Sequence, residues 1–158
     1  MTTDVLFTKG GTLEMKTHAL KASEVKKEWV LVDAKDAIVG RLACQVASIL
    51  RGKHKTSFAP YLDMGDNVII INAEKVRVSG KKPIQKMYHR HSGYPQGFKS
   101  ENFIELQRRH PEEILRRAIW GMLPKGPLGR DLMRNVRIFK GDQHTHAAQQ
   151  PKAVKIEA

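Results

Sequence analysis

The stretch Val68-Ile69-Ile70-Ile71 decides the fold, because four consecutive β-branched residues are typical of a buried strand. A strand with one solvent-facing side alternates apolar and polar residues, and this stretch does not alternate. It therefore predicts a sheet that is covered on both faces, as parallel sheets are. Upstream, the apolar run Trp29–Val32 predicts a second buried strand.

A helical pattern separates these two strands. Leu42, Val46, Ile49 and Leu50 are spaced four, three and one residues apart, which places them on one face of a helix. Gly52 lies just past this pattern, where a glycine commonly ends a helix. The order strand, helix, loop and strand predicts a right-handed parallel crossover, since nearly all such connections are right-handed.

Downstream patterns complete an α/β, three-layer single domain. They predict one helical turn at 73–76, a basic strand at 86–91, helices at about 100–108 and 111–122, and a last strand at 136–139. The residues predicted to form the core are Trp29, Leu42, Val46, Ile70, Ile114 and Ile119. Cys44, the single cysteine, is interpreted as a small core residue on the first helix.

The basic charge of the chain is unevenly distributed. Its 158 residues include 28 Lys and Arg against 16 Asp and Glu, a net charge of +12. Residues 81–140 hold 14 of the basic residues and five of the acidic ones, so this window alone carries +9. A clustered positive excess favours a nucleic-acid surface over general solubility. A membrane span is not predicted, because no run approaches the ~18 apolar residues that one needs.

Rigid backbone and dense cations coincide in residues 118–141. A helical pattern runs into the turn Pro124-Lys125-Gly126-Pro127-Leu128-Gly129, and a short helix and a strand follow. The prolines fix the backbone, while Gly126 and Gly129 permit close approach and unusual dihedral angles. The cations of this segment are Lys125, Arg130, Arg134, Arg137 and Lys140. Cations that are placed before the ligand arrives suit a polyanion.

Residues 88–95, Tyr-His-Arg-His-Ser-Gly-Tyr-Pro, interleave aromatic and cationic side chains. Aromatic rings and guanidinium planes stack on exposed RNA bases, while cations meet phosphates. The alternative is that Tyr88 or Tyr94 belongs partly to the core. The loop cations at 53–55 and 81–82 also fit an RNA surface, and their alternative is a solvated turn.

Other chemistries find weaker support. Gly40 precedes the first helical pattern, but Rossmann and Walker spacings are absent, so it is most simply a tight junction. The His pairs at 89/91 and 144/146 lack the four closely placed ligands of a zinc site, and neither metal nor cofactor is predicted. Two rival hypotheses remain. One is an enzyme with a nucleotide site at Gly40 and Asn72–Glu74, and the other is a protein that binds free duplex DNA.

Seven stretches in a fixed order resemble one known family. They are Trp29–Asp33, Val39–Ala43, Phe58–Tyr61, Gly65–Val68, Asn72–Val76, Tyr88–Pro95 and Ala118–Gly141. Over roughly residues 15–141, the chain resembles the L-thirteen family of large-subunit ribosomal proteins. Gln96 departs from the family's usual Gly-Tyr-Pro-Gly-Gly pattern, which leaves the shape of that loop open.

This resemblance implies a small, mostly parallel sheet of about four strands flanked by helices. It also implies a structural, non-enzymatic role in the large subunit, where the protein would bind ribosomal RNA by shape and phosphate contacts. Early subunit assembly, translation and contacts with neighbouring ribosomal proteins would follow, without a membrane or a small-molecule substrate. The predicted RNA-binding residues are Lys53, His54, Lys55, Lys81, Lys82, Lys86, Tyr88, His89, Arg90, His91, Tyr94, Lys99, Arg116, Arg117, Lys125, Arg130, Arg134, Arg137 and Lys140.

Three regions are expected along the chain. Residues 1–14 are expected to be a disordered extension, with Met1 or Met15 as the native start, and residues 15–141 to form the ribosomal protein domain. Residues 142–158 are polar and aperiodic, so a poorly ordered tail is expected. The single cysteine and the lack of a signal peptide at the start of the sequence fit a cytoplasmic protein in the large subunit.

Overall fold

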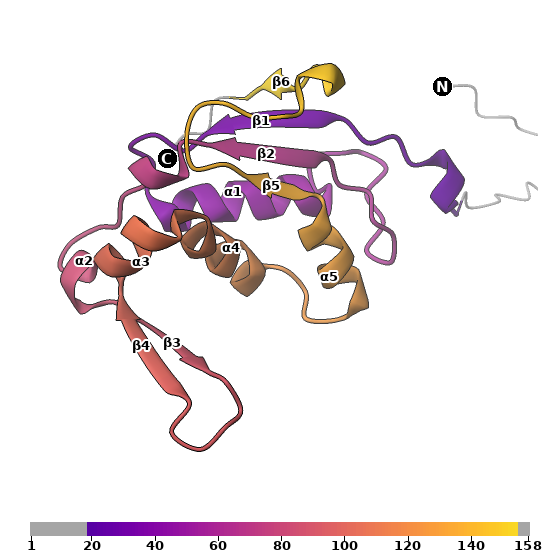
Figure 1. The fold of residues 1–158 in the computed structure, drawn as a ribbon. Coiled ribbons are helices and arrows are strands. Elements are labelled where there is room, and N and C mark those ends of the chain that lie inside the picture. Colours follow the sequence, from indigo (N-terminus) through magenta and orange to yellow (C-terminus); the bar gives the residue numbers. More distant parts are fainter. Residues whose placement is uncertain (1–18, 155–158) are drawn as a thin grey trace, which may run out of the picture.

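A four-stranded sheet organises residues 19–154, the part of the chain that the computed structural model describes (Figure 1). Its strands lie in the order β5, β2, β1, β6, and every neighbouring pair is parallel. The bounds are β1 (Trp29–Asp33), β2 (Asn67–Ile71), β5 (Val136–Ile138) and β6 (Lys152–Ala153). The predicted α/β class with a mostly parallel sheet of about four strands is therefore confirmed.

The crossover from β1 to β2 contains the predicted helix, α1 (Val39–Arg51). Its buried stripe includes Leu42 and Val46, which are fully buried as predicted. Gly52 ends the helix with φ +77°, and its N–H donates to the carbonyl oxygens of Ile49 and Ser48. Cys44 corrects one expectation: it lies away from this stripe and is exposed, because it follows Leu42 by more than half a helical turn.

Three helices cover one face of the sheet, α1, α4 (Pro111–Met122) and α5 (Pro127–Arg134) (Figure 1). Ile114 and Ile119 of α4 are fully buried, as predicted, in a cluster with α1 and the core-facing residues of β1 and β2. Pro111 is the first residue of α4, where its missing N–H costs nothing. Large-to-small substitutions within this cluster would leave cavities.

The other face of the sheet is covered by the segment that follows β5. Ile69 is fully buried yet lies outside the main core cluster, so its side chain faces this second side. His146 stacks on Trp29 with ring centroids 5.3 Å apart, and Phe139 meets both His144 and His146. Trp29 is consequently half-buried under this segment, and its prediction as a main-core residue is wrong.

The C-terminal segment corrects a second expectation. Residues 142–154 are not a poorly ordered tail: η3 (Ala147–Gln149) leads into β6, which pairs Lys152 and Ala153 with β1. The Lys152 ammonium lies 2.8 Å from Glu28 and closes this edge. A strand of only two residues, Lys152 and Ala153, carries no periodicity, so sequence patterns miss it. The remaining expectation for 155–158, and that for the extension 1–14, lie outside the described residues.

A hairpin projects from the body between the two halves of the chain (Figure 1). It comprises β3 (Met87–His91) and β4 (Phe98–Asn102), an antiparallel pair. The short helix α2 (Lys82–Gln85) precedes it, after η1 (Ala22–Glu24) and η2 (Ala73–Lys75) earlier in the chain. Helix α3 (Phe103–Arg109) follows with Asn102 as its N-cap. The helix predicted from about residue 100 thus begins three residues later, and β4 was missed.

The turn of the hairpin explains the departure at Gln96. Gln96 has φ +58° and Gly93 has φ +90°, both in the left-handed region that glycine favours. The family pattern places a glycine where this chain has Gln96, and a polar residue occupies that conformation at a modest cost. A Cβ atom at Gly97 would lie 2.8 Å from the Tyr94 carbonyl oxygen, a backbone atom, so the turn favours glycine there.

Candidate nucleic-acid interface

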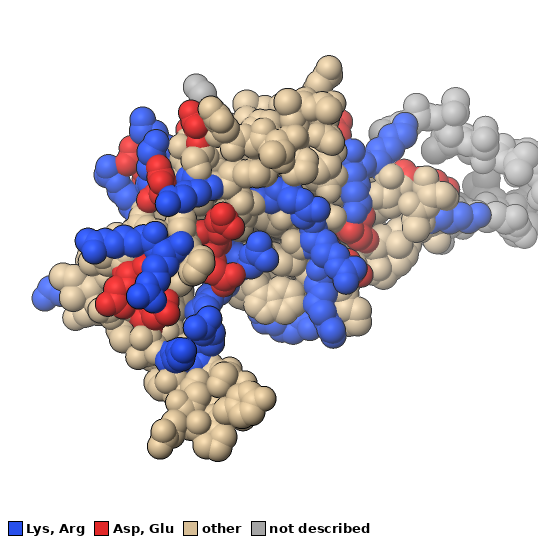
Figure 2. Space-filling view, viewed as in Figure 1, with Lys and Arg blue, Asp and Glu red and all other residues tan. Residues whose placement is uncertain are grey.

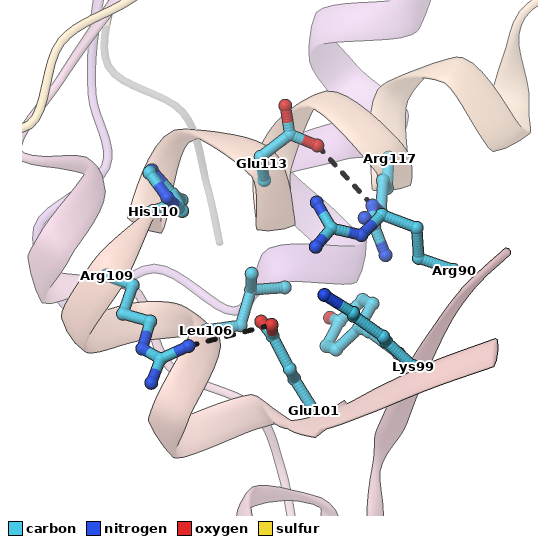
Figure 3. A pocket seen from close by; sticks show the side chains of 9 residues that line it. Arg90, Lys99, Glu101, Leu106, Arg109, His110, Glu113 and Arg117 are labelled. Carbon is cyan, nitrogen blue, oxygen red and sulfur yellow. Dashed lines mark ion pairs between the residues drawn. The ribbon is translucent and has the colours of Figure 1, made fainter. Parts of the chain in front are cut away.

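The hairpin has two chemically distinct faces, because side chains alternate along each strand. The register pairs Tyr88 with Glu101 and Arg90 with Lys99, so these four side chains share one face. All four line a cleft against helices α3 and α4 (Figure 3). The opposite face carries Met87, His89 and Phe98, and the rings of His89 and Phe98 stack with centroids 5.3 Å apart.

The cleft at the base of the hairpin has a volume of about 490 Å³. Its far wall comprises Leu106, Arg109 and His110 from the end of α3 together with Glu113 and Arg117 from α4. Figure 3 shows the charged ends of the two walls pointing toward one another across this space. Arg109 of α3 pairs with Glu101 of β4 at 3.8 Å, which links the two walls. Arg117 pairs with Glu113 along α4 at 3.4 Å.

Tyr88 forms the inner end of the cleft and is only partly exposed, since it packs against the core. Burial raises the pKa of its phenol, and the positive charge of Arg117 opposes that rise. The Lys86 ammonium and the Arg117 guanidinium lie 5.4 and 5.6 Å from the centre of its ring. The ring is thus engaged within the protein, which agrees with the alternative that Tyr88 belongs partly to the core.

The tip of the hairpin is free of formal charge. Residues 91–98 contain no Lys, Arg, Asp or Glu. Tyr94 is 75% exposed and Phe98 60% exposed. Figure 2 shows the hairpin's end without acidic or basic residues and blue side chains gathered toward its base. Exposed aromatic rings suit base stacking.

The turn before α5 is held by one of its two predicted glycines. A Cβ atom at Gly129 would lie 1.8 Å from the Pro124 carbonyl oxygen, so close approach requires glycine there. Gly126 has open space around it and an ordinary φ of −80°, so the expectation of an unusual dihedral angle at Gly126 is wrong. The Lys125 ammonium donates to the Trp120 carbonyl oxygen at 2.7 Å and lies 5.1 Å from the centre of the Trp120 indole ring.

The arginines after this turn lie on the surface. Arg130 and Arg134 are one turn apart on α5 and both exposed. Arg134 pairs with Asp131 at 3.2 Å, an exposed contact of little energetic weight. Arg137 is exposed on β5, the edge strand, and donates to the Val136 carbonyl oxygen. This segment therefore presents cations on a stiff frame, as its sequence indicated.

A buried carboxylate binds two of the three basic residues at 53–55. Asp66 is 4% exposed, accepts the Glu28 N–H at 2.9 Å and the Lys55 ammonium at 2.6 Å, and meets His54 Nε2 at 2.9 Å. Burial raises the pKa of the Asp66 carboxyl, but these donors and charges outweigh it and leave the pKa below its usual 3.8. Lys55 thus anchors the fold, and His54 contacts the same carboxylate although its side chain is 43% exposed; Lys53 is exposed.

The structure also brings in residues that sequence patterns did not select. Glu101, Arg109, His110 and Glu113 line the cleft, and Phe98 adds an exposed ring to the hairpin. The Gly-containing turn before Phe98 was the available signal for β4, since Lys99-Ser100-Glu101 shows no apolar alternation. The other predicted cations, which are Lys81, Lys82, Lys86, Arg116 and Lys140, are exposed.

Asn72, a residue of the rival nucleotide site, has a structural task in this fold. The Asn72 amide donates to Asp33 at 2.8 Å and bridges the ends of β1 and β2. No grouping of three or more His, Cys, Asp or Glu that could hold a metal occurs within residues 19–154. In the same part of the chain, each helix is too short or too polar to cross a membrane.

Comparison with known proteins assigns the family. The sequence model of ribosomal protein L13 matches residues 27–145. The chain is 56% identical over 138 residues to the large ribosomal subunit protein uL13 of Roseiflexus sp. (strain RS-1), covering 87% of this chain and 94% of the relative. It is 51% identical over 142 residues to that of Chromobacterium violaceum, covering 90% and 100%. The chain belongs to the ribosomal protein L13 family.

Proposed function

We propose that this protein is a structural constituent of the large ribosomal subunit that binds large-subunit rRNA and acts without catalysis. The observation that carries the proposal is the 56% identity, over 87% of the chain, to proteins named large ribosomal subunit protein. The charge pattern agrees with it, because cations cluster on the hairpin base and after α5, where polyanions can reach them.

The binding surface combines three elements. Exposed cations of the hairpin base and the 125–140 segment contact phosphates, and the uncharged hairpin tip stacks on unpaired bases. Recognition is of shape and backbone more than of a linear sequence, because most of the candidate groups are Lys and Arg. The full set of predicted residues, from Lys53 to Lys140, is retained. Within it, Lys55, His54, Tyr88 and Arg117 serve mainly to hold the surface in place.

The partners and location follow from this role. The protein assembles early with rRNA, contacts neighbouring large-subunit proteins and supports translation in the cytoplasm. Residues 15–141 form the ribosomal domain, with 1–14 as an extension and 142–158 as a polar C-terminal tail, in which Lys152 and Ala153 pair with β1.

Co-sedimentation tests the proposal directly. The full chain is incubated with large subunits that lack this protein, and the particles are pelleted through a high-salt wash. Retention at one copy per subunit supports the proposal, and recovery in the supernatant contradicts it. Affinity for structured rRNA and for duplex DNA at matched salt then separates ribosomal binding from general affinity for nucleic acids.

A further inference from the structure

The hairpin places two cations directly opposite each other. Arg90 of β3 pairs in register with Lys99 of β4, and both side chains point into the cleft (Figure 3). Like charges that face each other across an antiparallel pair destabilise it. Because both charges lie on the same face of the hairpin, an anion bound between them would relieve this repulsion.

The carboxylates of the cleft do not supply that anion. Glu101 pairs with Arg109 and Glu113 pairs with Arg117, so each acid already has its own arginine. Within residues 19–154, neither Arg90 nor Lys99 forms an ion pair. With four cationic and two acidic side chains on its walls, the cleft carries a positive excess concentrated at this pair.

The surroundings strengthen this excess. Leu106 is buried beneath the cleft and Tyr88 is partly buried at its inner end, so one side of the space is apolar. Charges beside an apolar wall interact more strongly with an anion than charges in open water do. An arginine offers a bidentate fork to phosphate oxygens, and a lysine adds a point charge.

We propose that Arg90 and Lys99 clamp one phosphodiester group of the rRNA backbone at the mouth of this cleft. The proposal rests on the proposed function and deepens it by naming the chemical group that this site takes. Arg109 and Arg117 act as positioning residues, because they hold Glu101 and Glu113 away from the incoming anion. The free hairpin tolerates the repulsion between the two cations, and the phosphate relieves it.

This arrangement predicts effects of opposite sign on stability and on binding. In the full chain, Lys99→Glu replaces the repulsive pair with an attractive one, so the melting temperature should rise by about 1–3 °C. The same substitution should lower the affinity for large-subunit rRNA at least tenfold, since it removes a charge-assisted contact and repels the phosphate. Lys35→Glu is the control, because it changes the net charge by the same amount on an exposed turn that is distant from the hairpin in sequence.

Arg90→Gln and Lys99→Gln provide milder variants in case the charge reversal disturbs the hairpin. Each should weaken rRNA binding without lowering the melting temperature. Normal rRNA binding by Lys99→Glu, or a loss no greater than that of Lys35→Glu, would overturn the phosphate site alone. Failure of the wild-type chain to bind rRNA would overturn the proposed function and this site with it.

Inorganic phosphate separates the two sources of the anion. Wild-type and Lys99→Glu proteins are melted in phosphate and in chloride at equal ionic strength. An equal response of the two proteins to phosphate supports a site that needs the RNA backbone around the phosphodiester. A rise in melting temperature in phosphate that the wild type shows and Lys99→Glu lacks would assign the site to free phosphate and overturn the proposal.

Discussion

Two groups of basic residues in this protein lie in opposite surroundings. Lys55 and His54 meet Asp66, a buried carboxylate with a lowered pKa. Arg90 and Lys99 face each other on the hairpin, and no carboxylate within residues 19–154 pairs with them. The first group holds the fold and the second is available to a ligand. Residue type and loop position alone therefore do not assign a cation to RNA.

The largest effect is expected at the carboxylate of the first group. Asp66→Ala removes the acceptor of the Glu28 N–H and leaves the partly buried Lys55 without its partner. We expect a loss of about 3–5 kcal/mol in the free energy of unfolding, measured by urea denaturation. Asp131→Ala, which breaks an exposed pair with Arg134, is the control and should cost less than about 1 kcal/mol. Equal costs for the two substitutions would remove the distinction between structural and exposed cations.

The same carboxylate predicts how acid affects stability. The folded-state pKa of Asp66 lies below the usual 3.8, so its contribution is complete above that value and is lost as the pH falls through the folded pKa. Urea midpoints of the wild type and Asp66→Asn should differ at pH 7 and approach each other below about pH 4. A difference that stays constant down to pH 3 would show that ionisation of Asp66 does not stabilise the fold.

The turn before α5 offers a backbone test of another set of exposed cations, those that follow Pro124–Gly129. Gly129→Ala drives a Cβ atom into the Pro124 carbonyl and should cost about 3 kcal/mol of stability, with weaker rRNA binding. Gly126→Ala has open space and an ordinary backbone angle, so it should change little. Circular dichroism melting and rRNA affinity are measured for both. Equal behaviour of the two variants would mean that the turn is not held by this contact.

The uncharged hairpin tip sharpens the comparison within the ligand-facing group. Tyr94→Ala should lower rRNA affinity by about 1–3 kcal/mol if one base stacks on its ring. Because no cation is lost, the slope of log K against log salt should stay unchanged. A smaller slope would place Tyr94 among residues that position phosphate contacts, and unchanged affinity would leave the tip to a protein partner.

Strong local patterns predicted the centre of the fold. The stripe of Leu42 and Val46, the stop at Gly52 and the run Val68–Ile71 each depend on neighbours in the sequence, and the structure confirms them. Strands β4 and β6 were missed because neither buries an apolar face of its own. Cys44 was misplaced because a helical stripe was read too broadly.

The candidate site depended on contacts between distant residues. The sequence marks 53–55 as a basic loop and 88–95 as a segment of aromatic and cationic residues. It does not reveal that Lys55 and His54 contact the buried Asp66 carboxylate. Nor does it reveal that Tyr88 lies under two cations. The pairing of Arg90 with Lys99 requires the register of a hairpin whose second strand was predicted as the start of a helix.

The salt dependence of rRNA binding tests most directly whether the fold divides the cations in this way. Affinity of the full chain for large-subunit rRNA is measured across a range of KCl concentrations for the wild type, Arg90→Gln and Lys55→Gln, each shown to be folded. If Arg90 contacts a phosphate, its loss should reduce the slope of log K against log salt by about 0.7–0.9, whereas Lys55→Gln should leave the slope unchanged and lower stability. Equal reductions for both variants, or no reduction for Arg90→Gln, would contradict the division.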